Sequence, residues 1–164
     1  MRRQSGILST LMSPPLERFL DAQDAPHGGY ADALAEIRGG RKRSHWIWYV
    51  FPQIAGLGRS SLAEAYAIGG RDEAVAYLRE PTLRARLVEI TQAVDDRLRE
   101  GVPLVRLMGS DIDALKLVSS LTLFRAAAAD DAEMASIADA VLDQAAAQGY
   151  PRCSFTLTAL GRSR

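Results

Sequence analysis

Apolar residues recur every three or four positions along most of the chain, which is the spacing of one face of an α-helix. The clearest example begins at Pro81 and ends before Gly101. Its apolar face is formed by Leu83, Leu87, Ile90, Val94 and Leu98. Because proline fits the first turn of a helix and glycine commonly ends one, we predict a long amphipathic helix here.

The same spacing predicts shorter helices on either side. Ser13 and Pro14 open the first, whose inward face begins at Leu16. Glycine pairs at 39–40 and 69–70 end two others, because glycine accepts the left-handed conformation found at helix C-termini. The further helices expected are at residues 29–38, 61–68, 72–78 and 131–148.

A helix from about Asp111 to Ala129 is expected at the centre of the fold. Ser110 begins a capping box, and the helix is apolar on nearly all sides, as buried helices are. One side of this helix is expected to be covered by Ile112, Leu115 and Val118. After Tyr150 the pattern leaves open a short docking segment or a strand. We predict an all-α, single-domain irregular helical bundle around a central buried helix.

Length and composition limit the classes of protein to which this chain can belong. The 164 residues suit one domain, read as a leader at 1–12 and a helical domain at 13–164. Twenty basic side chains balance twenty acidic ones, which disfavours a nucleic-acid binder and a membrane-surface protein. No segment has the apolar length of a signal peptide or a membrane span, so we expect a cytoplasmic protein. One cysteine and two histidines argue against a zinc site, and no cofactor or metal is expected.

The segment from Arg41 to Gln53 is the most unusual in the chain. If Ser44 caps a short helix, the preceding cations lie at its N-terminus, where backbone N–H groups and the helix dipole favour an anion. Alternatively, the aromatic residues belong to the core and the cations form a solvated turn. His45 is either structural or in contact with a ligand. The candidate site residues here are Arg41, Lys42, Arg43, Ser44, His45, Trp46, Trp48 and Gln53.

A second candidate set lies on the predicted central helix. Asp113, Lys116 and Ser120 fall on one stripe, with Ser119 beside them. Asp113 and Lys116 can pair three residues apart, which leaves open a buried ion pair or a binding-site lysine with serine hydroxyls. The stretch from Gly56 to Ser60 is similar to part of a phosphate-binding loop but lacks the preceding strand.

Several segments in order over residues 16–126 resemble the bacterial family catalogued as domain of unknown function 1810, whose members are sometimes labelled calpastatin. The segments that carry this resemblance include Phe19-Leu20-Asp21-Ala22-Gln23, Ser44-His45-Trp46, Phe51-Pro52-Gln53, Gly56-Leu57-Gly58, Lys116-Leu117, Ser119-Ser120 and Thr122-Leu123-Phe124. The resemblance implies a small, mainly helical protein with no established activity. Leu107-Met108-Gly109 departs from the family's usual Ile-Phe-Gly. A smaller similarity to N-glycosidases of ADP-ribose-type and riboflavin-pathway substrates favours nucleotide-like molecules.

The residues support two main functions. In the first, the chain binds a phosphorylated, nucleotide-like small molecule: the three cations contact the phosphate and a tryptophan stacks on the ring. His45, Asp113 and Lys116 would then supply acid–base chemistry, and whether the ligand is hydrolysed stays open. In the second, the chain is a protein-interaction module in which the tryptophans and Arg43 form a hot spot. The oligomeric state is not predicted.

Overall fold

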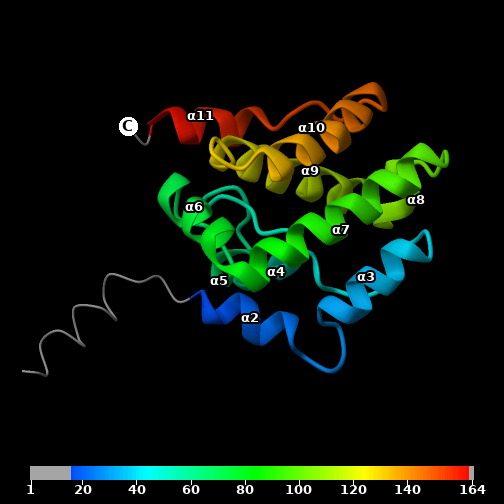
Figure 1. Ribbon diagram of the computed structural model, residues 1–164, viewed down its shortest axis with the longest axis horizontal. Helices are drawn as coiled ribbons and strands as arrows, with labels where there is room; N and C mark the ends of the chain where they lie inside the picture. Colours follow the sequence, from blue (N-terminus) through cyan, green and yellow to red (C-terminus); the bar gives the residue numbers. More distant parts are fainter. Residues whose placement is uncertain (1–15, 163–164) are drawn as a thin grey trace, which may run out of the picture.

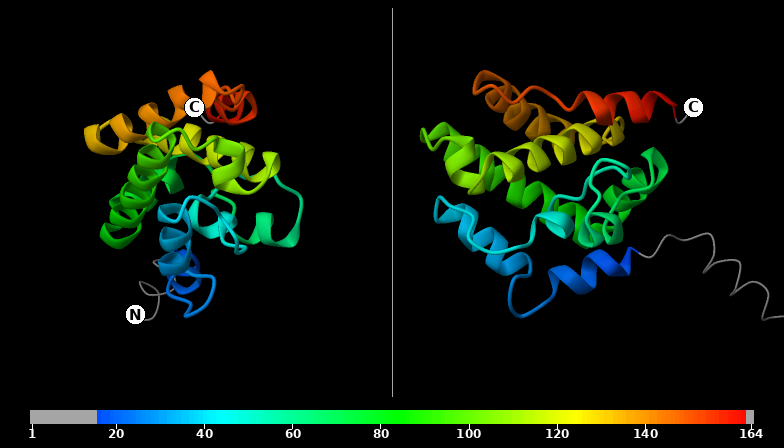
Figure 2. Two further views of the ribbon diagram at one scale, coloured as in Figure 1. Left: turned by 90° about the vertical axis from the view of Figure 1, so that its right-hand side faces the viewer. Right: turned by 180° about the vertical axis from the view of Figure 1, so that it is seen from behind.

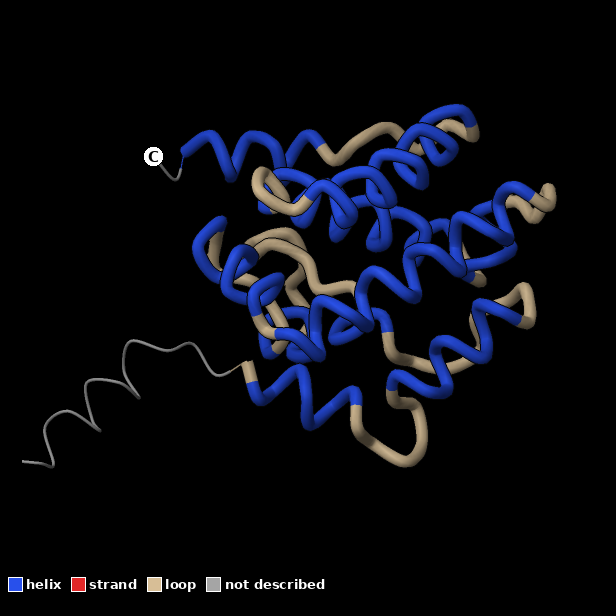
Figure 3. Tube along the Cα trace, viewed as in Figure 1, coloured by secondary structure: helices blue, strands red, loops and turns tan. Residues whose placement is uncertain are grey.

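The computed structural model describes residues 16–162, which form ten α-helices and, apart from one isolated bridge, no β-structure (Figures 1 and 3). The predicted leader at 1–12 and the predicted helix start at Ser13 lie outside these residues. The helices are α2 (Glu17–Gln23), α3 (Tyr30–Arg38), α4 (Ile47–Val50), α5 (Ser61–Ala65), α6 (Arg71–Arg79), α7 (Pro81–Arg99), α8 (Leu104–Met108), α9 (Asp111–Ala127), α10 (Ala132–Ala147) and α11 (Ser154–Arg162).

Helix α9 is the central element of the bundle. It packs against α4, α6, α8, α10 and α11, and lies between the upper pair α10–α11 and the remaining helices in Figures 1 and 2. Every residue of α9 from Leu117 to Phe124 is buried, as a helix covered on all sides requires. The structure thus confirms the prediction of an all-α, single-domain bundle around a central buried helix.

The first turn of α9 differs from the prediction. Ile112 is 65% exposed and Leu115 is 52% exposed, although both were expected to cover a side of the helix; Val118 is buried as expected. The outer side of this turn borders a surface hollow rather than another helix. The helix also ends at Ala127, two residues before the predicted end.

Helix α7 lies between α3 and α10 and contacts both. The predicted apolar face from Leu83 to Leu98 is buried, and the helix packs against both α3 and α10. Arg84 binds Asp131 through two hydrogen bonds of 2.7 and 2.9 Å, and Asp131 also caps α10. These contacts fix the start of α10 against α7.

Two connections depart from the predicted helices. Helix α5 ends at Ala65 instead of residue 68, because Ile68 forms the isolated bridge with Ile54. After Tyr150 the chain forms α11, so the strand alternative is wrong. Thr156 and Leu160, four residues apart, are the buried positions of α11, which packs on α9. No helix of residues 16–162 has the length and apolar character needed to cross a bilayer.

Candidate functional site

Helix α4, which follows the cations Arg41, Lys42 and Arg43, starts later than expected. Ser44 does not cap it; α4 begins at Ile47 and has four residues. The reason is that the Ser44 hydroxyl donates to Oε2 of Glu36 at 2.7 Å instead of accepting from the next turn.

Glu36 occupies the place that was predicted for an external anion. Its Oε1 accepts hydrogen bonds from the backbone N–H groups of Arg43 (2.5 Å) and Ser44 (2.7 Å) and from the indole N–H of Trp46 (3.0 Å). Burial alone would raise the pKa of Glu36, but the hydrogen bonds from Ser44, Arg43 and Trp46 outweigh it, so the pKa is lowered. The chain's own carboxylate thus occupies the backbone N–H groups that were expected to bind an external anion at this turn.

Lys42 is a buried structural cation. It is 8% exposed, and its Nζ lies 2.8 Å from Oδ2 of Asp113 and 2.6 Å from the carbonyl oxygen of Ser44. Its ammonium also lies 5.1 Å from the ring centre of Trp46, which is fully buried. Trp46 is thus a core residue, and the close partner of Asp113 is Lys42 rather than the predicted Lys116.

Lys116 lies over Trp48 instead. Its Nζ is 5.0 Å from the ring centre of Trp48 and 3.8 Å from Oδ1 of Asp113. The side chain of Lys116 is 25% exposed. The indole N–H of Trp48 is buried and has no acceptor among the described residues. Two candidate residues from separate parts of the sequence therefore meet at the surface.

Trp48 and Lys116 border two hollows that share Gln53, Gly58 and Ala63, and we name the pair of hollows the Trp48 groove. The inner hollow, of about 220 Å³, is lined by Trp48, Gln53, Ile54, Ala55, Gly56, Gly58, Ala63, Glu64, Tyr66 and Ala67. The outer hollow, of about 340 Å³, is lined by Gln53, Leu57, Gly58, Arg59, Ser60, Ala63, Ile112, Leu115, Lys116 and Ser119.

The loop between α4 and α6 forms most of the inner wall. The bridge closes this loop, since the Ala55 N–H donates to the Ile68 carbonyl and the Ile68 N–H to the Gln53 carbonyl, both at 2.8 Å. A Cβ at Gly58 would lie 2.6 Å from that of Ala63, so only glycine allows this close approach.

The outer hollow is positively charged. Arg59 and Lys116 line it, and none of the described residues in its wall is acidic. Asp113, which lies close to Lys116, also faces Lys42, so one carboxylate is shared by two ammonium groups. An excess of positive charge in a partly apolar hollow favours an anion.

The structure brings four of the candidate residues to the groove: Trp48, Gln53, Lys116 and Ser119. Arg41, Arg43 and His45 are exposed and line neither hollow. Ser120 is fully buried, and its hydroxyl has no partner among the described residues.

Sequence reasoning missed Glu36. It named Leu57 and Arg59 only within the stretch from Gly56 to Ser60, which is similar to part of a phosphate-binding loop and all five of whose residues line the groove.

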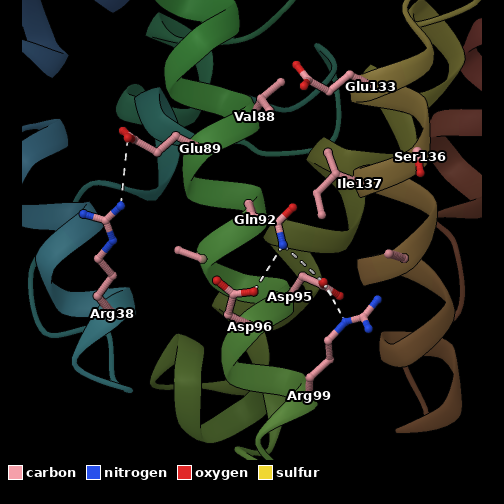
Figure 4. Close-up of a pocket in the computed structure, with 12 residues that line it drawn as sticks. Arg38, Val88, Glu89, Gln92, Asp95, Asp96, Arg99, Glu133, Ser136 and Ile137 are labelled. Carbon is pink, nitrogen blue, oxygen red and sulfur yellow. Dashed lines mark hydrogen bonds and ion pairs between the residues drawn. The ribbon is translucent and has the colours of Figure 1, made fainter.

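A larger hollow, of about 700 Å³, lies between α7 and α10 (Figure 4). None of the sequence-predicted site residues lines it. Its four carboxylates already have partners: Tyr30 donates to Glu89, Gln92 to Asp96, Arg84 to Glu133, and Arg99 to Asp95. Gln144 of α10 also donates to Asp95 at 2.6 Å, so Asp95 connects α7 to α10. Among residues 16–162 no histidine, cysteine and carboxylate cluster is arranged to hold a metal.

A family model described as a protein of unknown function (DUF1810) matches residues 13–150. The chain is also similar to the crystal structure of the conserved hypothetical protein Rv1873 from Mycobacterium tuberculosis, with 40% identity and a TM-score of 0.75 over 89% of this chain and 96% of that chain. No curated protein matches significantly. The family match spans most of the sequence, and the chain therefore belongs to the DUF1810 family.

Proposed function

We propose that the Trp48 groove binds a small anionic molecule with a planar ring, of the phosphorylated, nucleotide-like class. One observation carries the proposal: the ammonium of Lys116 lies over the indole of Trp48 at the junction of two hollows, and the outer hollow has cations but no acidic wall residue. Such a wall attracts an anionic group, and indole rings favour flat partners.

The ring would occupy the inner hollow between Trp48 and Tyr66, which supply its aromatic walls. The unpaired indole N–H of Trp48 offers a donor to a ring carbonyl or nitrogen once the side chains adjust. The anionic group would lie in the outer hollow near Arg59 and Lys116, with the Ser119 side chain beside it.

The proposal concerns binding rather than a reaction. His45 lines neither hollow, and the two carboxylate oxygens of Asp113 each face an ammonium group. The three residues proposed for acid–base chemistry therefore do not converge on one point of the groove.

The test is calorimetric titration of the purified chain with adenosine monophosphate and with inorganic phosphate. We expect the nucleotide to bind more tightly than phosphate, because stacking adds to the charge interaction. Lys116→Gln should weaken nucleotide binding at least about tenfold, the usual effect of losing a charged hydrogen bond.

Arg43→Gln is the matched control, because Arg43 is an exposed cation of the same sequence region that lines neither hollow. Its affinity should equal that of the wild type. If Arg43→Gln weakens binding and Lys116→Gln does not, or if neither compound binds, the proposal is wrong.

A further inference from the structure

Ile112 and Leu115 are large aliphatic side chains that the fold leaves exposed. Helix α9 is buried at every position from Leu117 to Phe124, yet these two residues in its first turns are 65% and 52% exposed. Covering the exposed part of such a side chain is favourable, because it removes apolar surface from water. Contiguous exposed apolar surface with a polar border is typical of binding surfaces.

Both residues line the outer hollow of the Trp48 groove. Across the hollow from α9, the loop that precedes α5 contributes Leu57 and Arg59. Lys116, one residue after Leu115, adds the second cation of the same wall. An apolar surface and two cations therefore border a single space of about 340 Å³.

A further exposed apolar side chain near the groove lies on α11. Phe155 is 43% exposed, and its ring lies against Gly56, where an added Cβ would be 3.5 Å from the ring carbon Cζ. Gly56 itself has a φ of 93°, so a larger residue is disfavoured in its place. Phe155 itself lines neither hollow, but it lies beside Gly56, which lines the inner hollow.

The charges of the wall suit one anionic group. Lys116 shares Asp113 with Lys42, so its charge is partly compensated, whereas Arg59 has no acidic neighbour in the wall. A polyphosphate would carry more negative charge than these two cations can match. A fully hydrophilic anion would leave Ile112 and Leu115 exposed to water.

We infer that the ligand of the Trp48 groove is amphiphilic: it carries one phosphate or carboxylate group bound by Arg59 and Lys116 and an adjacent hydrophobic body that covers Leu57, Ile112 and Leu115. This inference rests on the proposed function and narrows its ligand class, because a plain nucleotide has no such hydrophobic body.

Methyl, butyl and hexyl phosphate are suitable probes, since they share a head group and differ in apolar length. Calorimetric titration should show an affinity that rises about two- to fourfold per added methylene until the apolar surface is covered. The double variant Ile112→Gln/Leu115→Gln should lose the dependence on chain length, so that its affinities for the three esters differ by less than about twofold. Because both side chains are exposed, the variant is expected to fold, which circular dichroism verifies.

Val105→Gln is the control for removing an exposed aliphatic side chain, because Val105 lies on α8 and lines neither hollow. It should keep the full dependence on chain length. The double variant Arg59→Gln/Lys116→Gln should lose at least about tenfold in affinity for all three esters.

Three results would overturn the inference in distinguishable ways. If adenosine monophosphate binds in a Lys116-dependent manner and the three esters bind equally, the hydrophobic body is wrong and the proposed function stands. If hexyl phosphate binds equally well to Arg59→Gln/Lys116→Gln, the two cations do not bind the head group, and both the inference and the anionic site are wrong. If sedimentation shows a dimer that Ile112→Gln/Leu115→Gln dissociates, a second copy of the chain covers the apolar surface and the inference is wrong.

Discussion

Asp113 is the counter-charge of two lysines, Lys42 and Lys116. Its Oδ2 lies 2.8 Å from the buried Lys42, and its Oδ1 lies 3.8 Å from the more exposed Lys116. Lys42 has a carbonyl and the face of an indole as its other contacts, neither of which carries a full negative charge. The stability of the segment before α4 therefore depends on this carboxylate.

Asp113→Ala should lower the free energy of unfolding by about 3 kcal/mol, because it leaves the ammonium of Lys42 buried without its counter-charge. Asp72→Ala is the matched control, since Asp72 is exposed and also lies in the first turn of a helix, α6. Its loss should stay below about 1 kcal/mol, the effect of a helix dipole. Denaturant unfolding measures both, and equal losses would contradict a buried pair.

Glu36→Gln should lower the free energy of unfolding by about 1–3 kcal/mol at pH 7, because a carboxylate that accepts four hydrogen bonds is replaced by a neutral amide. The pKa of Glu36 is lowered from its ordinary value of 4.5, so its stabilisation is complete above that pH and is lost as the pH falls through the lowered pKa. The difference between wild type and variant should shrink in unfolding curves measured below pH 4.5. A pH-independent difference would exclude a role for the ionised carboxylate.

The contact between Glu36 and Ser44 could not be predicted from the sequence. The Ser44 region had the features of an anion site, and the structure does hold a carboxylate there. The carboxylate comes from the last turns of α3, eight residues earlier, and no local spacing connects it to Ser44. The adjacency of Trp48 and Lys116, 68 positions apart, likewise follows from packing between α4 and α9.

At the scale of elements, periodicity predicted the helices well and their ends less well. The face of α7 from Leu83 to Leu98 is buried as its spacing indicated, because a long amphipathic helix has one way to bury its apolar face. The predictions of where α4 starts and where α5 ends were wrong, because Ser44 and Ile68 make tertiary hydrogen bonds in place of helical ones. After Tyr150 the pattern left a strand open, but packing on α9 selected the helix α11.

Helix α9 should respond very differently to substitutions at its two ends. Ile112→Gln/Leu115→Gln should change the free energy of unfolding by less than about 0.5 kcal/mol per site, because both side chains are exposed. Leu117→Ala should cost about 2–5 kcal/mol, since Leu117 is fully buried. Thermal and denaturant unfolding provide the measurement. A large loss in the double variant would mean that the first turn contributes to the core.

At the scale of the whole molecule, one continuous core cluster reaches from Phe19 in α2 to Leu160 in α11. The helices of its two sides are joined through α7 and α9, which contact most of the others. A single cluster of this kind leaves no boundary at which one part of residues 16–162 could separate from the rest. Unfolding is therefore expected to be cooperative.

The two tryptophans test this cooperativity. Trp46 and Trp48 are the sole tryptophans of the chain and both belong to the segment around α4, so fluorescence reports that segment, whereas far-ultraviolet circular dichroism reports all helices. Because Trp46 is fully buried in the common core, the two signals should give the same midpoint and the same slope in a urea titration. In Glu36→Gln both midpoints should fall together, since the hydrogen bond to Trp46 connects this segment to α3. A fluorescence transition at lower urea than the circular dichroism transition would mean that the Trp48 groove opens before the bundle unfolds.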